Sequence, residues 1–174
     1  MTALETMRKQ KDEFFATDPR SPLTLEQRAR FGGLDYYPEN PELVFETELD
    51  TDVDPDEVRM QTSTGEERTY RRAGRIRFAI EGRPAELTLF ASEDQHTLFL
   101  PFRDGTSAGE TYAAGRYIDV APPHGGRVVV DFNEAYNPYC AYNERWSCLL
   151  PPRENWLDVP IRAGEKRFPG SGVH

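Results

Sequence analysis

The stretch RIRFAIEGRPAELTLF, residues 75–90, decides the fold class of this chain. Apolar side chains occupy every second position over its first half, at Ile76, Phe78 and Ile80. This period of two is typical of a strand with one buried face. Gly82-Arg83-Pro84 is a turn signal, and Leu87 and Leu89 then resume the alternation against polar neighbours. The stretch therefore predicts a β-hairpin.

Similar patterns occur on both sides of this hairpin. We predict further strands at residues 43–49, 58–60, 98–102, 116–120 and 127–132. Turn-forming residues separate them at 63–66, 92–95 and 122–126, and no segment between them is long enough for a crossover helix. Residues 42–132 are thus predicted to be mainly β, as an antiparallel meander that closes as a barrel or roll or packs as a sandwich.

Residues 1–40 are predicted to form an N-terminal helical arm. Two threonines are each followed three residues later by Glu or Gln, which is the capping-box pattern, at Thr2/Glu5 and Thr24/Gln27. We therefore expect helices over residues 2–16 and 24–31, ended by Asp18-Pro19 and by Gly32-Gly33.

The regular pattern stops after Phe132. Residues 133–168 are predicted to be a long polar and aromatic loop region, and 169–174 a loose tail. Aromatic side chains in this region favour an ordered, packed segment, at Tyr136, Tyr139, Tyr142, Trp146 and Trp156. The whole chain of 174 residues has the length of a single domain.

The charge of the chain limits its expected partners. Its formal net charge is −9, whereas proteins that bind nucleic acid or anionic membranes need a basic face. No segment is long and apolar enough to span a membrane, and the charged N-terminus lacks the apolar core of a secretory signal. We expect a cytoplasmic protein without nucleic-acid or membrane partners, and the sequence leaves cofactor and oligomeric state open.

The first candidate site segment is FRDGTSAGETYAAGRY, residues 102–117. Its glycines allow a close backbone approach to a ligand, and Asp104 and Thr106 add polar groups beside Arg116 and Tyr117. It matches neither a phosphate-binding nor a dinucleotide-binding fingerprint. The alternative interpretation is a structural loop in which Asp104 braces its own backbone.

The second candidate segment is DFNEAYNPYCAYNERWSCLLPPREN, residues 131–155. It is rich in Asn and Tyr side chains, at Asn133, Tyr136, Asn137, Tyr142, Asn143 and Asn155. Their amides and phenols can either bind a polar molecule or brace a buried loop. Both interpretations remain open from the sequence.

The two cysteines, Cys140 and Cys148, also lie in this segment. Three interpretations are open: both cysteines are buried packing residues, the two form a redox pair, or one of them is a nucleophile. A nucleophile would need acid–base help, for which Asp104 and Glu154 are the candidates. No C-x₂-C or H-x₃-H spacing occurs, so no metal site is predicted.

Two charged runs are interpreted as surface. The carboxylates of residues 50–57 begin like an EF-hand loop, but Pro55 and Gln61 replace the required glycine and glutamate, so a solvated acidic turn is expected. The arginines at 68, 71, 72, 75 and 77 are expected to form surface ion pairs with the many carboxylates.

Several blocks of the chain resemble one bacterial and archaeal family. They are KDEFF, SPL and FGGLDYYP near the N-terminus, the central FRDGTSAGETYAAGRY, and DFNEAYNPYCAYNERWSCLLPPREN with the closing IRAGEK. Over nearly the whole chain they are similar to the family called domain of unknown function 1684. The resemblance implies one site made by two segments and supplies no reaction.

The family pattern falls on defined positions of this sequence. They are Asp104, Thr106, Gly115, Arg116, Tyr117, Asn133, Tyr136, Asn137, Cys140, Tyr142, Asn143, Cys148, Pro151, Pro152, Glu154 and Asn155. One departure from the pattern is Ala113-Ala114 before Gly115, where the family pattern has a glycine. A side chain at this position narrows the space through which a ligand can approach the backbone.

The sequence thus supports three hypotheses of different classes. The first is a binding protein that holds a small polar molecule in a pocket between residues 103–117 and 133–157. The second is a hydrolase or thiol-dependent enzyme that uses Cys140 or Cys148 with Asp104 or Glu154. The third is a non-catalytic interaction protein with a large exposed apolar patch.

Overall fold

A four-stranded antiparallel sheet is built around the predicted hairpin. The computed structural model describes residues 1–92 and 96–169. Within them the sheet consists of β4 (Arg72–Ile80), β5 (Arg83–Ala91), β6 (Leu98–Phe102) and β7 (Arg116–Val120), and each strand pairs with the next in sequence order. Glu81 and Gly82 both have positive φ, 51° and 77°, so they form the tight turn, and Arg83 with Pro84 already belongs to β5.

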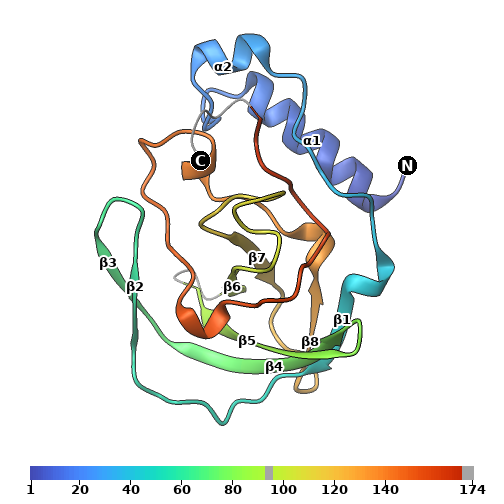
Figure 1. Cartoon of the computed structure of the whole chain (residues 1–174), viewed down its shortest axis with the longest axis vertical. Coiled ribbons are helices and arrows are strands. Elements are labelled where there is room, and N and C mark those ends of the chain that lie inside the picture. The colour runs from blue at the N-terminus through green and yellow to red at the C-terminus, as the bar shows by residue number, and fades with distance from the viewer. Residues whose placement is uncertain (93–95, 170–174) are drawn as a thin grey trace.

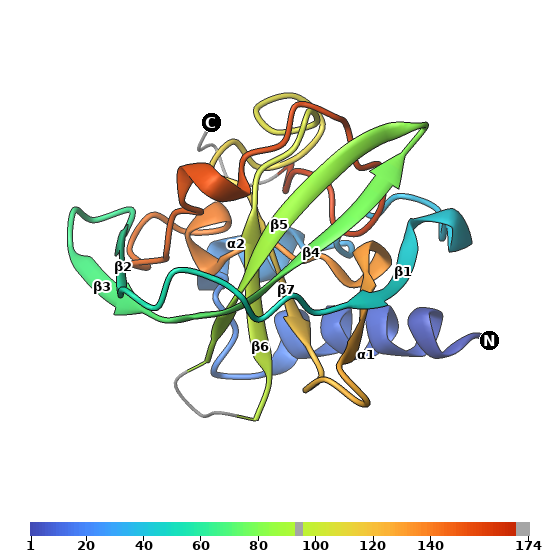
Figure 2. The ribbon, with the colours of Figure 1, turned by 90° about the horizontal axis from the view of Figure 1, so that it is seen from below.

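The remaining strands form two smaller antiparallel pairs. β1 (Val44–Glu48) pairs with β8 (Arg127–Asp131), and β2 (Val58–Gln61) pairs with β3 (Glu67–Tyr70). The β2–β3 hairpin lies on the opposite side of the molecule from β1 (Figure 2). The predicted antiparallel, mainly β class is confirmed, whereas closure into a barrel is not, because no sheet among residues 1–92 and 96–169 closes on itself.

A glycine allows the end of β1 to approach β4. Asp50 and Arg75 form an antiparallel bridge there, with backbone hydrogen bonds of 2.9 and 2.8 Å. A Cβ on Gly74 would lie 2.5 Å from the Cγ of Leu49, so only glycine fits at this crossing. Strand β1 is thereby held between β8 and β4. A meander, in which each strand pairs with the next in sequence, does not predict this position.

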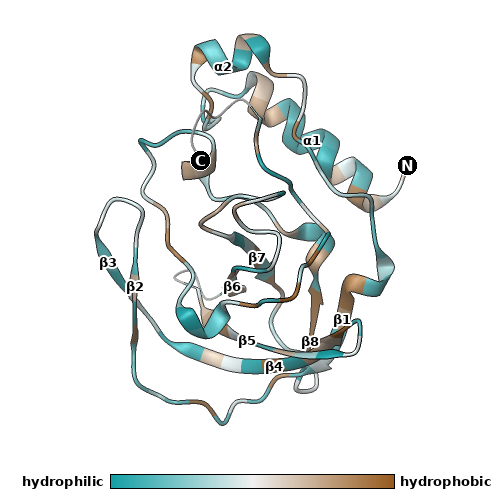
Figure 3. Cartoon of the chain, viewed as in Figure 1, coloured by the Kyte–Doolittle hydropathy of each residue, from teal (hydrophilic) through white to brown (hydrophobic). Residues whose placement is uncertain are grey.

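Both predicted helices are present with their caps. Helix α1 (Ala3–Thr17) begins at Thr2 and α2 (Leu25–Arg30) at Thr24, each with a complete capping box. The helices lie at the opposite end of the molecule from the β4–β5 hairpin (Figure 1), and their residues are mostly hydrophilic (Figure 3). Phe15 is the residue that α1 buries. The arm attaches through an apolar cluster in which Phe15 and Leu23 pack with Tyr142 and Phe168.

The predicted C-terminal loop region contains three short 3₁₀ helices. They are η2 (Phe132–Glu134), η3 (Tyr139–Ala141) and η4 (Arg153–Asn155), and a fourth, η1 (Pro41–Leu43), precedes β1. The predicted turn at 92–95 and tail at 169–174 lie largely outside the described residues. No helix in the described part of the chain is long and apolar enough to cross a membrane.

Three apolar clusters form the core. The largest gathers buried side chains of every strand of the four-stranded sheet with those of β8 and the segment around Ile161. A second joins Phe15 of α1 to Tyr142 and Phe168. The third, which contains Met60, Phe90, Tyr117 and Leu149, connects the β2–β3 hairpin to the sheet and to the C-terminal segment.

Candidate functional site

The polar groups of the 103–117 loop are mostly taken up by internal contacts. The Asp104 carboxylate lies 3.6 Å from the buried Arg116 guanidinium and accepts hydrogen bonds from the Thr106 hydroxyl (2.8 Å) and the Ile161 N–H (2.5 Å). Arg116 donates in addition to the carbonyls of Ile161, Ala163 and Glu165. These groups fasten the C-terminal segment to β7, whereas the bracing interpretation expected Asp104 to hold the backbone of its own loop.

Two of the predicted ligand-binding amides also hydrogen-bond to the backbone of distant segments. Asn155 accepts from the Thr88 N–H and donates to the carbonyls of Thr88 and Pro101, each at 2.8 Å. Asn133 exchanges hydrogen bonds of 2.8 and 2.9 Å with the backbone of Asn40. Their amides are thus occupied by main chain, and neither residue lines the groove described next.

Four of the other predicted residues line a groove. It has a volume of about 470 Å³ and lies where the β2–β3 hairpin, the strands β6 and β7 and the C-terminal segment meet. We call it the aromatic groove, and its lining consists of Arg68, Tyr70, Phe99, Tyr117, Tyr136, Asn137, Pro138, Tyr139, Trp146, Ser147, Cys148 and Leu149. The predicted candidates Tyr117, Tyr136, Asn137 and Cys148 are thus brought together.

Three residues of the groove lie outside both predicted segments. Tyr70 and Phe99 belong to β3 and β6 and were not singled out in the sequence, and Arg68 was interpreted as part of a surface arginine cluster. Arg72, Arg75 and Arg77 of that cluster do form ion pairs, with Glu154, Glu86 and Asp50 respectively. No local sequence signal distinguishes Arg68 from them.

The walls of the groove are uncharged phenols and rings. Tyr117 packs edge-on against both Phe99 and Tyr136, with ring centroids 4.9 and 5.8 Å apart. The Tyr136 hydroxyl donates to Asp119 at 3.0 Å, and the Tyr117 hydroxyl donates to the Leu149 carbonyl. Burial raises the pKa of both tyrosines, so the phenols stay protonated near neutral pH.

Asn137 differs from the other buried amides. Its side chain is 1% exposed and its Nδ2 donates to the Lys166 carbonyl at 3.0 Å, while its Oδ1 has no hydrogen-bond partner. A buried amide oxygen without a donor is unusual and needs an explanation such as a bound molecule.

The two cysteines are free thiols that contact one another. The Cys140 N–H donates to the Cys148 sulfur at 3.2 Å, and the Tyr112 hydroxyl lies 3.4 Å from the Cys140 sulfur. Hydrogen bonds from the Cys148 thiol and then from Tyr112 lower the pKa of Cys140 to about 6, although burial opposes this.

The acid–base partners that the sequence suggested for a cysteine lie elsewhere. Asp104 is paired with Arg116, and Glu154 binds Arg72 at 2.9 Å and the Thr88 hydroxyl at 2.8 Å. Neither carboxylate lines the aromatic groove. Tyr142 and Asn143 also lie apart from it: the Tyr142 hydroxyl donates to the Glu165 carboxylate, and the Asn143 side chain accepts from the nearby Arg145 N–H.

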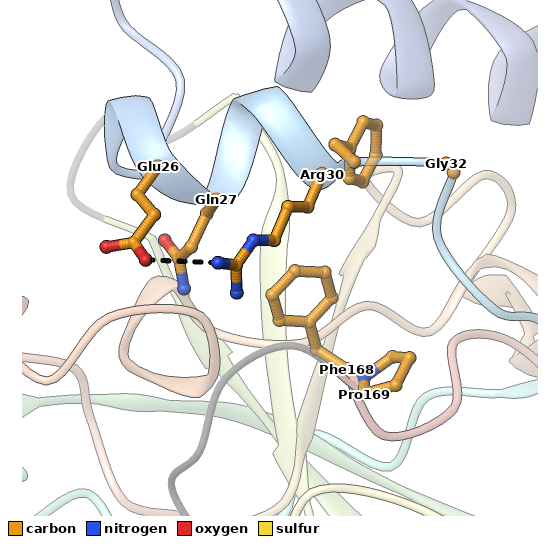
Figure 4. Close-up of a pocket in the computed structure, with 8 residues that line it drawn as sticks. Glu26, Gln27, Arg30, Gly32, Phe168 and Pro169 are labelled. Carbon is orange, nitrogen blue, oxygen red and sulfur yellow. Dashed lines mark ion pairs between the residues drawn. The ribbon is translucent and has the colours of Figure 1, made fainter.

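A second cavity lies beside α2 (Figure 4). It has a volume of about 330 Å³ and is lined by residues 26–27, 30–33 and 168–169. Glu26 and Arg30 form an ion pair of 3.5 Å with both side chains about four-fifths exposed, and Gln27 caps α2 and binds the Tyr142 carbonyl. Its polar groups already have structural roles, so the aromatic groove is the better candidate site.

Comparisons with known proteins agree on one family. Residues 29–166 match the family described as Protein of unknown function (DUF1684). A solution NMR structure of the uncharacterized protein from gene locus rrnAC0354 of Haloarcula marismortui is 34% identical, with a TM-score of 0.71 over 94% of this chain and 91% of that one. The comparison with curated proteins gave no match. The chain therefore belongs to the DUF1684 family.

Proposed function

We propose that this protein binds a small polar molecule in the aromatic groove. The observation that carries the proposal is the buried, unpartnered Oδ1 of Asn137. Leaving such an acceptor unsatisfied costs about 1–3 kcal/mol, which an N–H or O–H donor of a ligand would recover.

The rest of the lining indicates the kind of ligand. Rings of Phe99, Tyr117 and Tyr136 offer flat apolar surfaces suited to a planar or apolar part of the molecule. Arg68 is exposed at the groove and adds a positive charge, which favours a carboxylate or phosphate. The volume falls within the roughly 300–1,000 Å³ of typical small-molecule sites.

The two predicted segments contribute unequally to this site. Residues 136–139 and 146–149 form one wall, whereas Tyr117 is the contribution of the 103–117 segment. Asp104, Thr106 and Arg116 do not line the groove, and Asp104 and Arg116 hold residues 161–165 against β7.

The proposal is tested by thermal shift against a library of planar, anionic metabolites. Asn137→Ala removes the acceptor, and Asn143→Ala is the matched control because Asn143 lies outside the groove. A hit should stabilise the wild type and the Asn143→Ala protein, and lose roughly tenfold or more in affinity for Asn137→Ala, because one hydrogen bond is worth about 0.5–1.5 kcal/mol and an unpaired group more.

The proposal fails if hits bind Asn137→Ala as tightly as the wild type. It also fails if no compound of this class raises the melting temperature of a folded wild-type protein.

A further inference from the structure

The cysteine pair lies at the edge of the aromatic groove and has unequal access to it. Cys148 lines the groove and is partly exposed, whereas Cys140 is 3% exposed. The Cys140 N–H donates to the Cys148 sulfur at 3.2 Å, so the buried cysteine lies directly behind the accessible one.

Separate elements hold the two cysteines in this arrangement. Cys140 lies within η3, and the backbone of Cys148 is clamped by Ser63 of the β2–β3 turn. The Ser63 N–H donates to the Cys148 carbonyl at 2.9 Å, and the Cys148 N–H donates to the Ser63 hydroxyl at 3.1 Å. The pair is therefore preorganised by the fold, although seven residues separate the cysteines.

We propose that Cys140 and Cys148 form a dithiol–disulfide exchange centre that reduces a low-molecular-weight disulfide bound in the aromatic groove. The inference uses the same groove as the proposed function but stands on the thiol pair, so it does not require Asn137. Two vicinal thiols, one exposed as the attacking group and one behind it as the resolving group, are the arrangement that this chemistry needs.

In the first step the Cys148 sulfur attacks one sulfur of the ligand R–S–S–R, while the Cys140 thiolate accepts the Cys148 proton. The ligand S–S bond breaks as a new one forms, which gives a mixed disulfide on Cys148 and a free thiolate RS⁻. The charge of this thiolate is attracted to Arg68, which also lines the groove.

In the second step the RS⁻ takes the proton from Cys140. The Cys140 sulfur then attacks the Cys148 sulfur and expels the second RS⁻, which takes a proton from water. The products are a Cys140–Cys148 disulfide and two molecules of RSH, so the pair of electrons passes from the protein dithiol to the ligand disulfide.

The lowered pKa of Cys140 agrees with this sequence of steps. The same contact that lowers the pKa of Cys140 raises the pKa of Cys148, so the pair shares one proton held on Cys148, and this proton passes to Cys140 as Cys148 attacks. The Tyr112 hydroxyl, 3.4 Å away, stabilises that charge.

The test treats reduced, full-length protein with hydroxyethyl disulfide, a small polar probe, and follows intact mass after alkylation. The wild type should end as an intramolecular disulfide, with peptide mapping placing the bond between Cys140 and Cys148. Cys140→Ser should stop at a mixed disulfide on Cys148, formed roughly tenfold more slowly at pH 7 because an unassisted thiol is only a few per cent thiolate. Cys148→Ser should stay unmodified, because its remaining thiol is buried.

Circular dichroism verifies that each variant is folded. Peptide mapping of the oxidised wild type tests the proposal even if a variant does not fold. The inference is overturned if the folded wild type keeps both thiols or accumulates only mixed disulfide. Equal labelling of Cys140→Ser and Cys148→Ser would overturn it as well. Asn137→Ala should still form the internal disulfide, so loss of ligand binding and loss of thiol exchange are distinguishable.

Discussion

At the scale of single residues, the buried charges of this protein position its site. Arg116 and Asp104 are each 1% exposed in their side chains, and both are surrounded by main-chain partners from residues 161–165. Such a pair costs much desolvation and is retained here because it holds an irregular segment in one place. These contacts favour a positioning role for both residues over the ligand-binding role that the sequence predicts.

Removing Arg116 should therefore be strongly destabilising. Arg116→Met leaves the Asp104 charge buried without its counter-ion and leaves three carbonyls without a donor, so we expect a loss of about 3–5 kcal/mol in the free energy of unfolding. Urea denaturation measures it. The matched control is Arg127→Met, whose side chain is 46% exposed and should lose less than about 1 kcal/mol. Equal losses for the two variants would contradict the positioning role.

At the scale of elements, what could be predicted was local. The capping boxes at Thr2 and Thr24 lie within four residues of sequence, and both helices begin where the sequence predicts. Alternation likewise identified the β4–β5 hairpin. These signals depend on neighbouring residues alone, so a single sequence contains them.

Pairings between distant elements could not be predicted. The bridge between Thr62 and Leu149, which brings the β2–β3 hairpin to the C-terminal segment, joins residues far apart in sequence, and no local pattern encodes it (Figure 1). The sequence therefore singled out Tyr117, Tyr136, Asn137 and Cys148 of the groove lining, and it did not single out the wall from β3 and β6. The sequence of residues 131–155 also does not indicate which of its Asn side chains hydrogen-bond to the main chain.

Asn155 should matter for the sheet and not for ligand binding. Its amide joins η4 to β5 and to the end of β6 through three main-chain hydrogen bonds. Asn155→Ala should lower the free energy of unfolding by about 3 kcal/mol, roughly 1 for each group left unpaired. Guanidinium denaturation checks this, with Asn143→Ala expected to stay within about 0.5 kcal/mol of wild type. Stable Asn155→Ala protein that no longer binds groove ligands would show that the residue binds ligand directly.

At the scale of the whole molecule, the aromatic groove lies where three parts of the chain converge. The β2–β3 hairpin, the edge formed by β6 and β7, and residues 136–149 each contribute one side. The cavity beside α2 lies instead between α2 and residues 168–169 (Figure 4). The two cavities share no lining residue, so binding at one or the other gives separate signals.

The measurement that tests the groove most directly is a titration followed by backbone amide NMR, with the compound that gives the largest thermal shift. We predict that chemical-shift changes gather at Asn137, Tyr139 and Cys148 and at the indole N–H of Trp146, and that Asn137→Ala needs roughly tenfold more compound to reach half of these changes. Changes gathered instead at Arg30 and Gly33, with the groove residues unmoved, would contradict the account.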